Sequence, residues 1–197
     1  VQVEQTQENL FRFPLAIEVY EGSSLKRYEE WVDEKSESFS FKYSNKPDLI
    51  NVDADRTLLA EISDEKSVEN LVHLYKHGSK YEDRREAIDG LSTQQENEMA
   101  YNILMNALSD PFYGLRIMAI DKIDLSNANA KKAIQAIEKI ASNDEKTLAR
   151  AEAIKKLDAL ENQEYAKLFR TSLSSNSSAV KGSALKALYK IDKAAAM

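Results

Sequence analysis

The stretch Ala119-Ile120-Asp121-Lys122-Ile123 belongs to a motif that recurs along the chain and decides its fold. The other copies are Ala87-Ile88-Asp89-Gly90-Leu91, Ala153-Ile154-Lys155-Lys156-Leu157 and Ala184-Leu185-Lys186-Ala187-Leu188. The leading alanines lie 32, 34 and 31 residues apart. In each copy, Ile or Leu follows the alanine after one and four residues, so the apolar side chains share one face of a helix. The motif therefore predicts four regularly spaced amphipathic helices.

A second amphipathic stretch precedes each copy of the motif. These stretches are Val68–Tyr75, Tyr101–Leu108, Ala133–Ile140 and Tyr165–Leu173. Turn-forming residues such as Asp110-Pro111 separate the helical stretches. A pair of helices cannot bury its apolar face alone, so repeated pairs must stack. We predict that residues 63–197 form an all-α superhelical solenoid of four HEAT-like helix pairs. The tetratricopeptide repeat has a similar length, but its Trp and Gly signature is missing.

Residues 1–62 follow a different period. Apolar side chains alternate with other residues at Phe11, Phe13, Leu15, Ile17 and Val19, which predicts a strand. Pro14 cannot donate a ladder hydrogen bond, so we expect this strand to be an edge strand or locally irregular. Shorter alternations at Val1 and Val3 and at Phe39, Phe41 and Tyr43 predict further strands. The predicted fold is mixed, with a small β-sandwich over 1–62 that relies on the helical part for stability.

Composition excludes several classes of function. The 197 residues contain 43% hydrophobic and 30% charged residues, enough for a core, and no apolar run of membrane-spanning length. The absence of cysteine excludes disulfides, thiolate zinc sites and cysteine nucleophiles. A net charge of −6 without a concentrated basic stripe argues against nucleic-acid binding. We read the chain, which begins at Val1, as a piece of a longer protein.

Charge is unevenly distributed along the chain. Residues 1–62 contain seven Lys or Arg against 13 Asp or Glu, whereas residues 163–197 contain six against two. The basic C-terminal end suits an acidic surface, although a solvated helical face is the commoner explanation for such a run.

The two histidines of the chain, His73 and His77, are weak candidates for metal ligands. Their spacing of four places both on one face of a helix, as in zinc peptidases. The peptidase motif also requires a Glu directly after the first His, and here that residue is Leu74. Histidines before Gly78 more often interact with a helix C-terminus. No Gly-x-Ser-x-Gly elbow or phosphate-binding loop occurs, so we expect no catalytic residue and no cofactor in this chain.

A basic residue stands three positions before each leading alanine. These four residues, the basic ladder, are Arg84, Arg116, Arg150 and Lys181. An Asp precedes Arg116 and Arg150 by six residues, at Asp110 and Asp144. One interpretation is structural: the Asp caps the second helix of its repeat and the base tethers repeats through such loops. The other is a row of cations facing a peptide carboxylate. The structural interpretation is favoured because the spacing follows the repeat itself.

The order of segments resembles the C-terminal, non-catalytic region of a gluzincin zinc aminopeptidase of the aminopeptidase N-like family. The similar residues lie in Val3–Gln7, Phe11–Val19, Phe39–Phe41, Lys46–Asp53 and Leu58-Leu59. In that family a β-sandwich follows the catalytic domain and helical repeats follow the sandwich. The zinc motif His-Glu-x-x-His and the substrate-amine motif Gly-x-Met-Glu-Asn are missing from this chain, so the resemblance assigns no zinc or catalytic residue to it.

The resemblance implies a role without chemistry of its own. The chain would brace the catalytic domain of its parent and help wall off the chamber that holds peptide substrates. Zinc would belong to the parent enzyme and not to this segment. The alternative is a free-standing HEAT-repeat scaffold that binds a protein partner. Sequence upstream of Val1 discriminates between the two, because only the first requires a His-Glu-x-x-His motif there.

Overall fold

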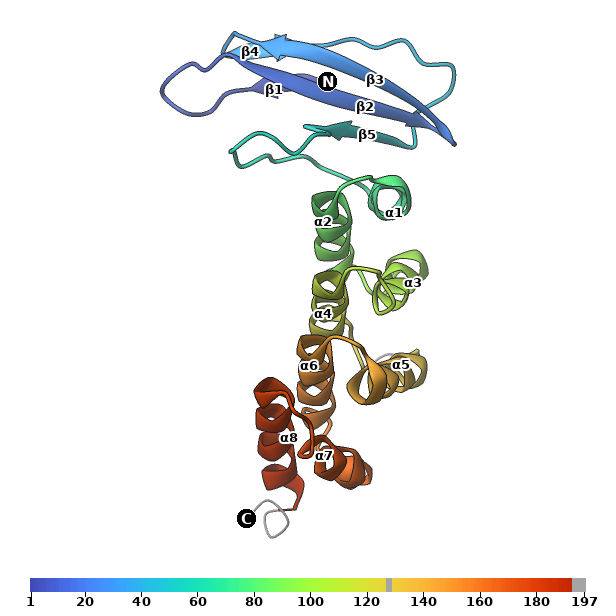
Figure 1. Ribbon diagram of the computed structural model, residues 1–197. Helices are drawn as coiled ribbons and strands as arrows, with labels where there is room; N and C mark the ends of the chain where they lie inside the picture. Colours follow the sequence, from blue (N-terminus) through green and yellow to red (C-terminus); the bar gives the residue numbers. More distant parts are fainter. Residues whose placement is uncertain (127–128, 193–197) are drawn as a thin grey trace. The chain divides into compact units, whose positions relative to one another are not determined.

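The computed structural model describes residues 1–126 and 129–192 and contains two compact units, Val1–Ala87 and Ile88–Met197 (Figure 1). The described residues form short antiparallel strands followed by eight α-helices, so the fold is mixed, as predicted. The predicted domain boundary at 62/63 lies between the last strand, which ends at Val52, and the first helix, which begins at Val68; it stays a prediction.

The strands of the first unit form two small antiparallel sheets. The short sheet pairs β1 (Gln2–Glu4) with β4 (Ser36–Ser38). In the larger sheet, β2 (Phe13–Glu21) lies between β3 (Ser24–Val32) and β5 (Leu49–Val52). The apolar alternation marks the core face of β2, since Leu15, Ile17 and Val19 are at most 3% exposed and join Val32 in one core. On the opposite face, Glu18 and Tyr20 are also buried. Side chains around the short sheet, Val1, Val3 and Phe39, pack against this core.

Two strand predictions need correction. β2 is a central strand and not an edge strand, but β5 pairs with it only from Ile17 to Tyr20, so Pro14 has β3 as its single neighbour. The alternation at Phe39, Phe41 and Tyr43 does not form a strand, because β4 already ends at Ser38. Phe39 and Phe41 still pack on the core, whereas Tyr43 is 59% exposed, so burial accounts for the first two positions of the alternation and not for the third.

The eight α-helices confirm the helical period read from the sequence. They are α1 (Val68–His77), α2 (Tyr81–Ser92), α3 (Glu98–Ala107), α4 (Tyr113–Lys122), α5 (Ala130–Asn143), α6 (Thr147–Asp158), α7 (Ala166–Ser172) and α8 (Ser178–Ile191), with a 3₁₀ turn at Gln163–Tyr165 before α7. Side-chain caps set several starts: Ser67 forms a capping box with Asn70, and Asn97 and Ser177 accept hydrogen bonds from the first turns of α3 and α8.

In the second unit, the two helices of each pair pack on each other, and the second helices of consecutive pairs also pack on one another. α3 contacts α4, α5 contacts α6 and α7 contacts α8, while α6 also contacts α4 and α8. Figure 1 shows α4, α6 and α8 in one row and α3, α5 and α7 beside it. The leading alanines of α4, α6 and α8, Ala119, Ala153 and Ala184, are fully buried, and their small side chains allow this close packing. No helix within the described ranges is long and apolar enough to cross a membrane.

Candidate functional site

Arg116 is held by an ion pair and by hydrogen bonds to backbone carbonyls. It lies on α4 and is 8% exposed. Its Nε and a terminal nitrogen donate to the two carboxylate oxygens of Asp144, at 2.8 and 2.7 Å, and its other terminal nitrogen donates to the backbone carbonyl of Asp110 at 2.8 Å. Asp144 lies in the loop between α5 and α6, so this two-pronged ion pair joins two consecutive helix pairs.

The aspartates precede the helix caps by two residues and are not caps themselves. Asp110 accepts a hydrogen bond from the backbone N–H of Phe112, and Asp144 accepts one from Lys146, each at 2.8 Å. Phe112 and Lys146 are the N-cap residues of α4 and α6. Burial would raise the pKa of Asp144, but the hydrogen bonds from Arg116 and Lys146 lower it below its usual value. The expectation that each Asp directly caps its helix was wrong by two residues.

The rest of the ladder shares the position of Arg116 without sharing its environment. Arg150 on α6 is half-buried and donates one hydrogen bond, of 3.3 Å, to the carbonyl of Ala141. The residue that corresponds to Asp144 in the last pair is Ser175, which has no carboxylate to offer. Lys181 is exposed on α8, and Arg84 is half-buried on α2. Within the second unit, Arg116, Arg150 and Lys181 therefore differ in burial and in the contacts described for them.

The two histidines lie on α1 as the spacing required. Their ring centroids are 4.3 Å apart, and the His73 ring also meets Tyr20 edge-on at 5.1 Å. Nε2 of His73 is buried and has no hydrogen-bond partner among the described residues. Burial, with a further contribution from His77, lowers the pKa of His73 below its usual value. Within the described residues, no group of three His, Cys, Asp or Glu side chains is arranged to hold a metal ion.

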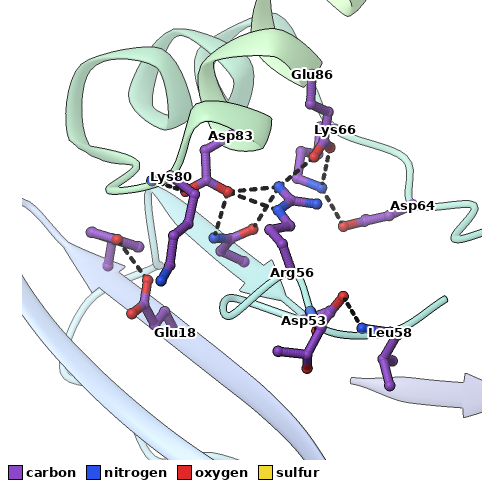
Figure 2. Close-up of polar contacts among 12 residues, drawn as sticks. Glu18, Asp53, Arg56, Leu58, Asp64, Lys66, Lys80, Asp83 and Glu86 are labelled. Atoms are coloured by element: carbon purple, nitrogen blue, oxygen red, sulfur yellow. Dashed lines mark hydrogen bonds and ion pairs between the residues drawn. The ribbon is translucent and has the colours of Figure 1, made fainter. Parts of the chain in front are cut away.

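Sequence reasoning missed a charged cluster in the first unit, shown in Figure 2. Arg56 lies shortly after β5 and donates two hydrogen bonds to Asp83 on α2, one from Nε at 2.9 Å and one from a terminal nitrogen at 2.7 Å. The same terminal nitrogen also donates to Glu86 at 2.5 Å. Lys66 donates to Glu86 at 2.7 Å and to Asp64 at 2.6 Å. Together these five residues form the Arg56 cluster.

The backbone around Arg56 explains how the cluster is held. Asp53 and Arg56 both have positive φ, 51° and 55°, so the chain makes a tight turn directly after β5. Asp53 stabilises this turn because its carboxylate accepts hydrogen bonds from the backbone N–H groups of Thr57 and Leu58. Asp83, which is 1% exposed at its side chain, accepts a further hydrogen bond from the backbone of Lys80 at the start of α2.

Electrostatics in the Arg56 cluster favour a structural role. Burial would raise the pKa of Glu86, but Lys66 and Arg56 lower it below its usual value. A carboxylate held in its charged form by two cations is a poor proton donor or acceptor near neutral pH. The signal available in the sequence was the run Asp53–Arg56, but its partners on α2 are 27 and 30 residues downstream of Arg56.

The first unit also contains a large, partly apolar cavity. Its volume is about 940 Å³. Residues from β1, the start of β2, β5 and the chain between β5 and α1 line it. Three of the apolar lining residues are strongly exposed: Phe11 at 57%, Leu59 completely and Ile62 at 44%. Large apolar side chains that project around a hollow are typical of a surface that another protein domain covers.

These features supply contact surfaces and ion pairs and no complete catalytic arrangement among the described residues. The cavity can accept apolar groups, the Arg56 cluster ties the end of β5 to α2, and Arg116 joins two helix pairs. Neither the scan of family models nor the search of curated proteins finds a match to this chain.

Proposed function

We propose that the chain is a non-catalytic C-terminal segment of a zinc metallo-aminopeptidase, in which it braces the catalytic domain and helps wall off the peptide chamber. The observation that carries the proposal is the exposed apolar rim of the cavity, formed by Phe11, Leu59 and Ile62. Two of these residues, Phe11 and Leu59, lie in the segments that resemble the aminopeptidase family. The catalytic domain of the same parent chain would cover this rim. Zinc would be bound within that catalytic domain.

The finer features of the fold belong to the same proposal. We infer a β-sandwich from the packing of Val1, Val3 and Phe39 on the core of the larger sheet. We infer a HEAT-like solenoid from the row α4, α6 and α8 and from the ion pair between Arg116 and Asp144 that joins consecutive pairs. Both inferences support a brace, because stacked pairs form a stiff element that contacts its neighbours along one direction.

The decisive experiment starts from the native gene. We expect the reading frame upstream of Val1 to encode His-Glu-x-x-His with a distal Glu. In the purified full-length enzyme, the double change Phe11→Asp and Leu59→Asp should lower the melting temperature of the catalytic domain and leave bound zinc unchanged. Leu25→Asp is the matched control, because Leu25 on β3 is 47% exposed and does not line the cavity.

Two results would contradict this function. An upstream frame without the zinc motif removes the parent enzyme from the proposal. A double variant that melts like the Leu25→Asp control shows that the rim is not covered by the catalytic domain. As a companion test, the isolated chain with added zinc should not hydrolyse aminoacyl chromogenic substrates, and activity that disappears on His73→Ala would also contradict the proposal.

The second candidate is a free-standing HEAT-repeat scaffold that binds a protein partner. The observation in its favour is the exposure of Leu185 at 46% and Tyr189 at 50% on α8. An unrelated module upstream of Val1 would favour this candidate over the first.

A further inference from the structure

The last copy of the repeat motif leaves uncovered a position that is buried in the earlier copies. Ile120 on α4 and Ile154 on α6 are fully buried, whereas the corresponding Leu185 on α8 is 46% exposed. The other motif positions of α8 keep their cover, since Ala184 and Leu188 are fully buried. The loss of cover is therefore restricted to one side of α8.

The uncovered side is the one that faces the next pair in the earlier repeats. On α4, Arg116 stands one turn before Ile120, on the same side of the helix, and its guanidinium reaches Asp144 in the following pair. α4 packs against α6, and α6 packs against α8. On α8 the same side carries Lys181 and Leu185 in the positions of Arg116 and Ile120.

The neighbouring positions of α8 complete a surface that fits a helix. Gly182 corresponds to Ala151 of α6, which is only 8% exposed, and no atom lies within 4 Å of where a Cβ on Gly182 would be. Another backbone can therefore approach closely at Gly182. Tyr189, two turns after Lys181, is 50% exposed and extends the stripe. We call Lys181, Gly182, Leu185 and Tyr189 the α8 end face.

Charge decides what kind of helix fits. Residues 178–191, which form α8, include three lysines and no acidic residue; Lys190 already pairs with Asp158 at 2.7 Å. The ladder cation of α4, Arg116, binds Asp144, which lies just before the start of α6. We propose that the α8 end face binds an amphipathic helix of a partner protein that carries an Asp or Glu just before its first turn. A second copy in a symmetric pair fits poorly, because it would bring the lysines of two α8 helices together.

This inference is independent of the proposed peptidase role. It depends on the repeat register and on the charge of α8, and both remain the same whether the parent is an aminopeptidase or a scaffold. A binding measurement that uses no peptidase activity tests it, so a negative result would leave the proposed function standing.

The probe is a labelled peptide with the chain's own sequence from Asp144 to Asp158, which contains the acid and the helix that pack after α4. A hydrocarbon staple replaces Leu148 and Lys155, because both are exposed in the structure and are not needed for packing. Fluorescence anisotropy measures its binding to the complete 197-residue chain. We expect saturable binding that weakens at least tenfold with Leu185→Glu and at least threefold with Lys181→Glu. An Asp144→Asn probe should also bind at least threefold more weakly.

Lys186→Glu is the matched control. It makes the same charge change on α8, but its counterpart on α6 is Lys155, which stays exposed although α6 is covered by α8. The control should change binding less than twofold, and circular dichroism should show that all variants melt like the unchanged chain. Absence of saturable binding, or binding that Leu185→Glu leaves unchanged, overturns the proposal. A dimer that Leu185→Glu dissolves also overturns it, because the occupant is then a second copy.

Discussion

Replacing Arg116 by Ala should strongly destabilise the second unit. The change removes both hydrogen bonds to Asp144 and the bond to the carbonyl of Asp110. The Asp144 side chain, only 7% exposed, would then remain buried without its cation. Removing one partner of a buried ion pair costs about 3–5 kcal/mol. Asp144 keeps the hydrogen bond from the backbone of Lys146, so we expect the lower end of that range, about 3 kcal/mol.

This loss is large enough to measure by thermal or urea unfolding. For a unit of this size, 1 kcal/mol corresponds to roughly 4 °C, so the melting temperature should fall by about 12 °C. Arg150→Ala is the control, because it removes a single 3.3 Å bond and should cost about 1 kcal/mol at most. The double variant Arg116→Ala, Asp144→Ala should lose less than the sum of the single losses. If Arg116→Ala melts within a few degrees of the unchanged chain, the tether is refuted and a ligand-facing ladder becomes the better explanation.

Three further predictions concern the first unit. Acid should destabilise it as the pH falls below about 4.5, because the lowered pKa of Glu86 stabilises the fold only while its carboxylate stays charged; a Glu86→Gln variant should show a flatter pH profile of urea unfolding. Replacing His73 by Phe should raise stability by about 1 kcal/mol at pH 7.5, because an unpaired buried nitrogen is removed. The gain should grow below pH 6.5, because His73 then binds a proton in the unfolded chain but, with its lowered pKa, does so less readily in the folded chain. An equal gain in stability at pH 7.5 and 5.5 would contradict this cause. Residues 1–62 expressed alone should show no cooperative melt by circular dichroism, because Asp83 and Glu86, the partners of Arg56, lie beyond that fragment.

The helical half of the fold was predictable because its signal is local and repeated. An alanine followed by apolar residues after one and four positions fixes a buried helix face, and four copies in phase leave little ambiguity. The β half was less predictable, since period two reports burial and not pairing. Phe39 and Phe41 are partly buried and pack on the core as the alternation suggested, but the backbone that carries them has already left β4.

The Arg56 cluster was out of reach of sequence reasoning for two physical reasons. Its turn uses positive φ at Asp53 and Arg56, where the usual marker, glycine, is absent. Its ion pairs join Arg56 to residues on α2 that no local pattern connects to it. The cavity was equally hidden, because it is formed by several separate segments of the first unit.

The basic ladder shows that a repeated position does not guarantee a repeated contact, and this leads to a last prediction. Ser175 stands where Asp110 and Asp144 stand in the earlier pairs, and its hydroxyl accepts the same kind of hydrogen bond, from the backbone of Ser177 at 3.2 Å. Ser175→Asp should keep this turn and place a carboxylate where Arg150 lacks one. Charge-assisted hydrogen bonds contribute about 1.5–3 kcal/mol, so we expect a gain near the lower figure and a melting temperature higher by roughly 6 °C.

The control for this prediction is the same change in an Arg150→Ala background, where the gain should disappear. An equal gain in both backgrounds would mean that the new carboxylate acts on the start of α8 and not through Arg150. No gain in either background would mean that the loop before α8 does not present its side chain to α6 as Asp144 presents its own to α4. A gain that requires Arg150 would establish that the ladder position acts as a tether wherever the following loop supplies an acid.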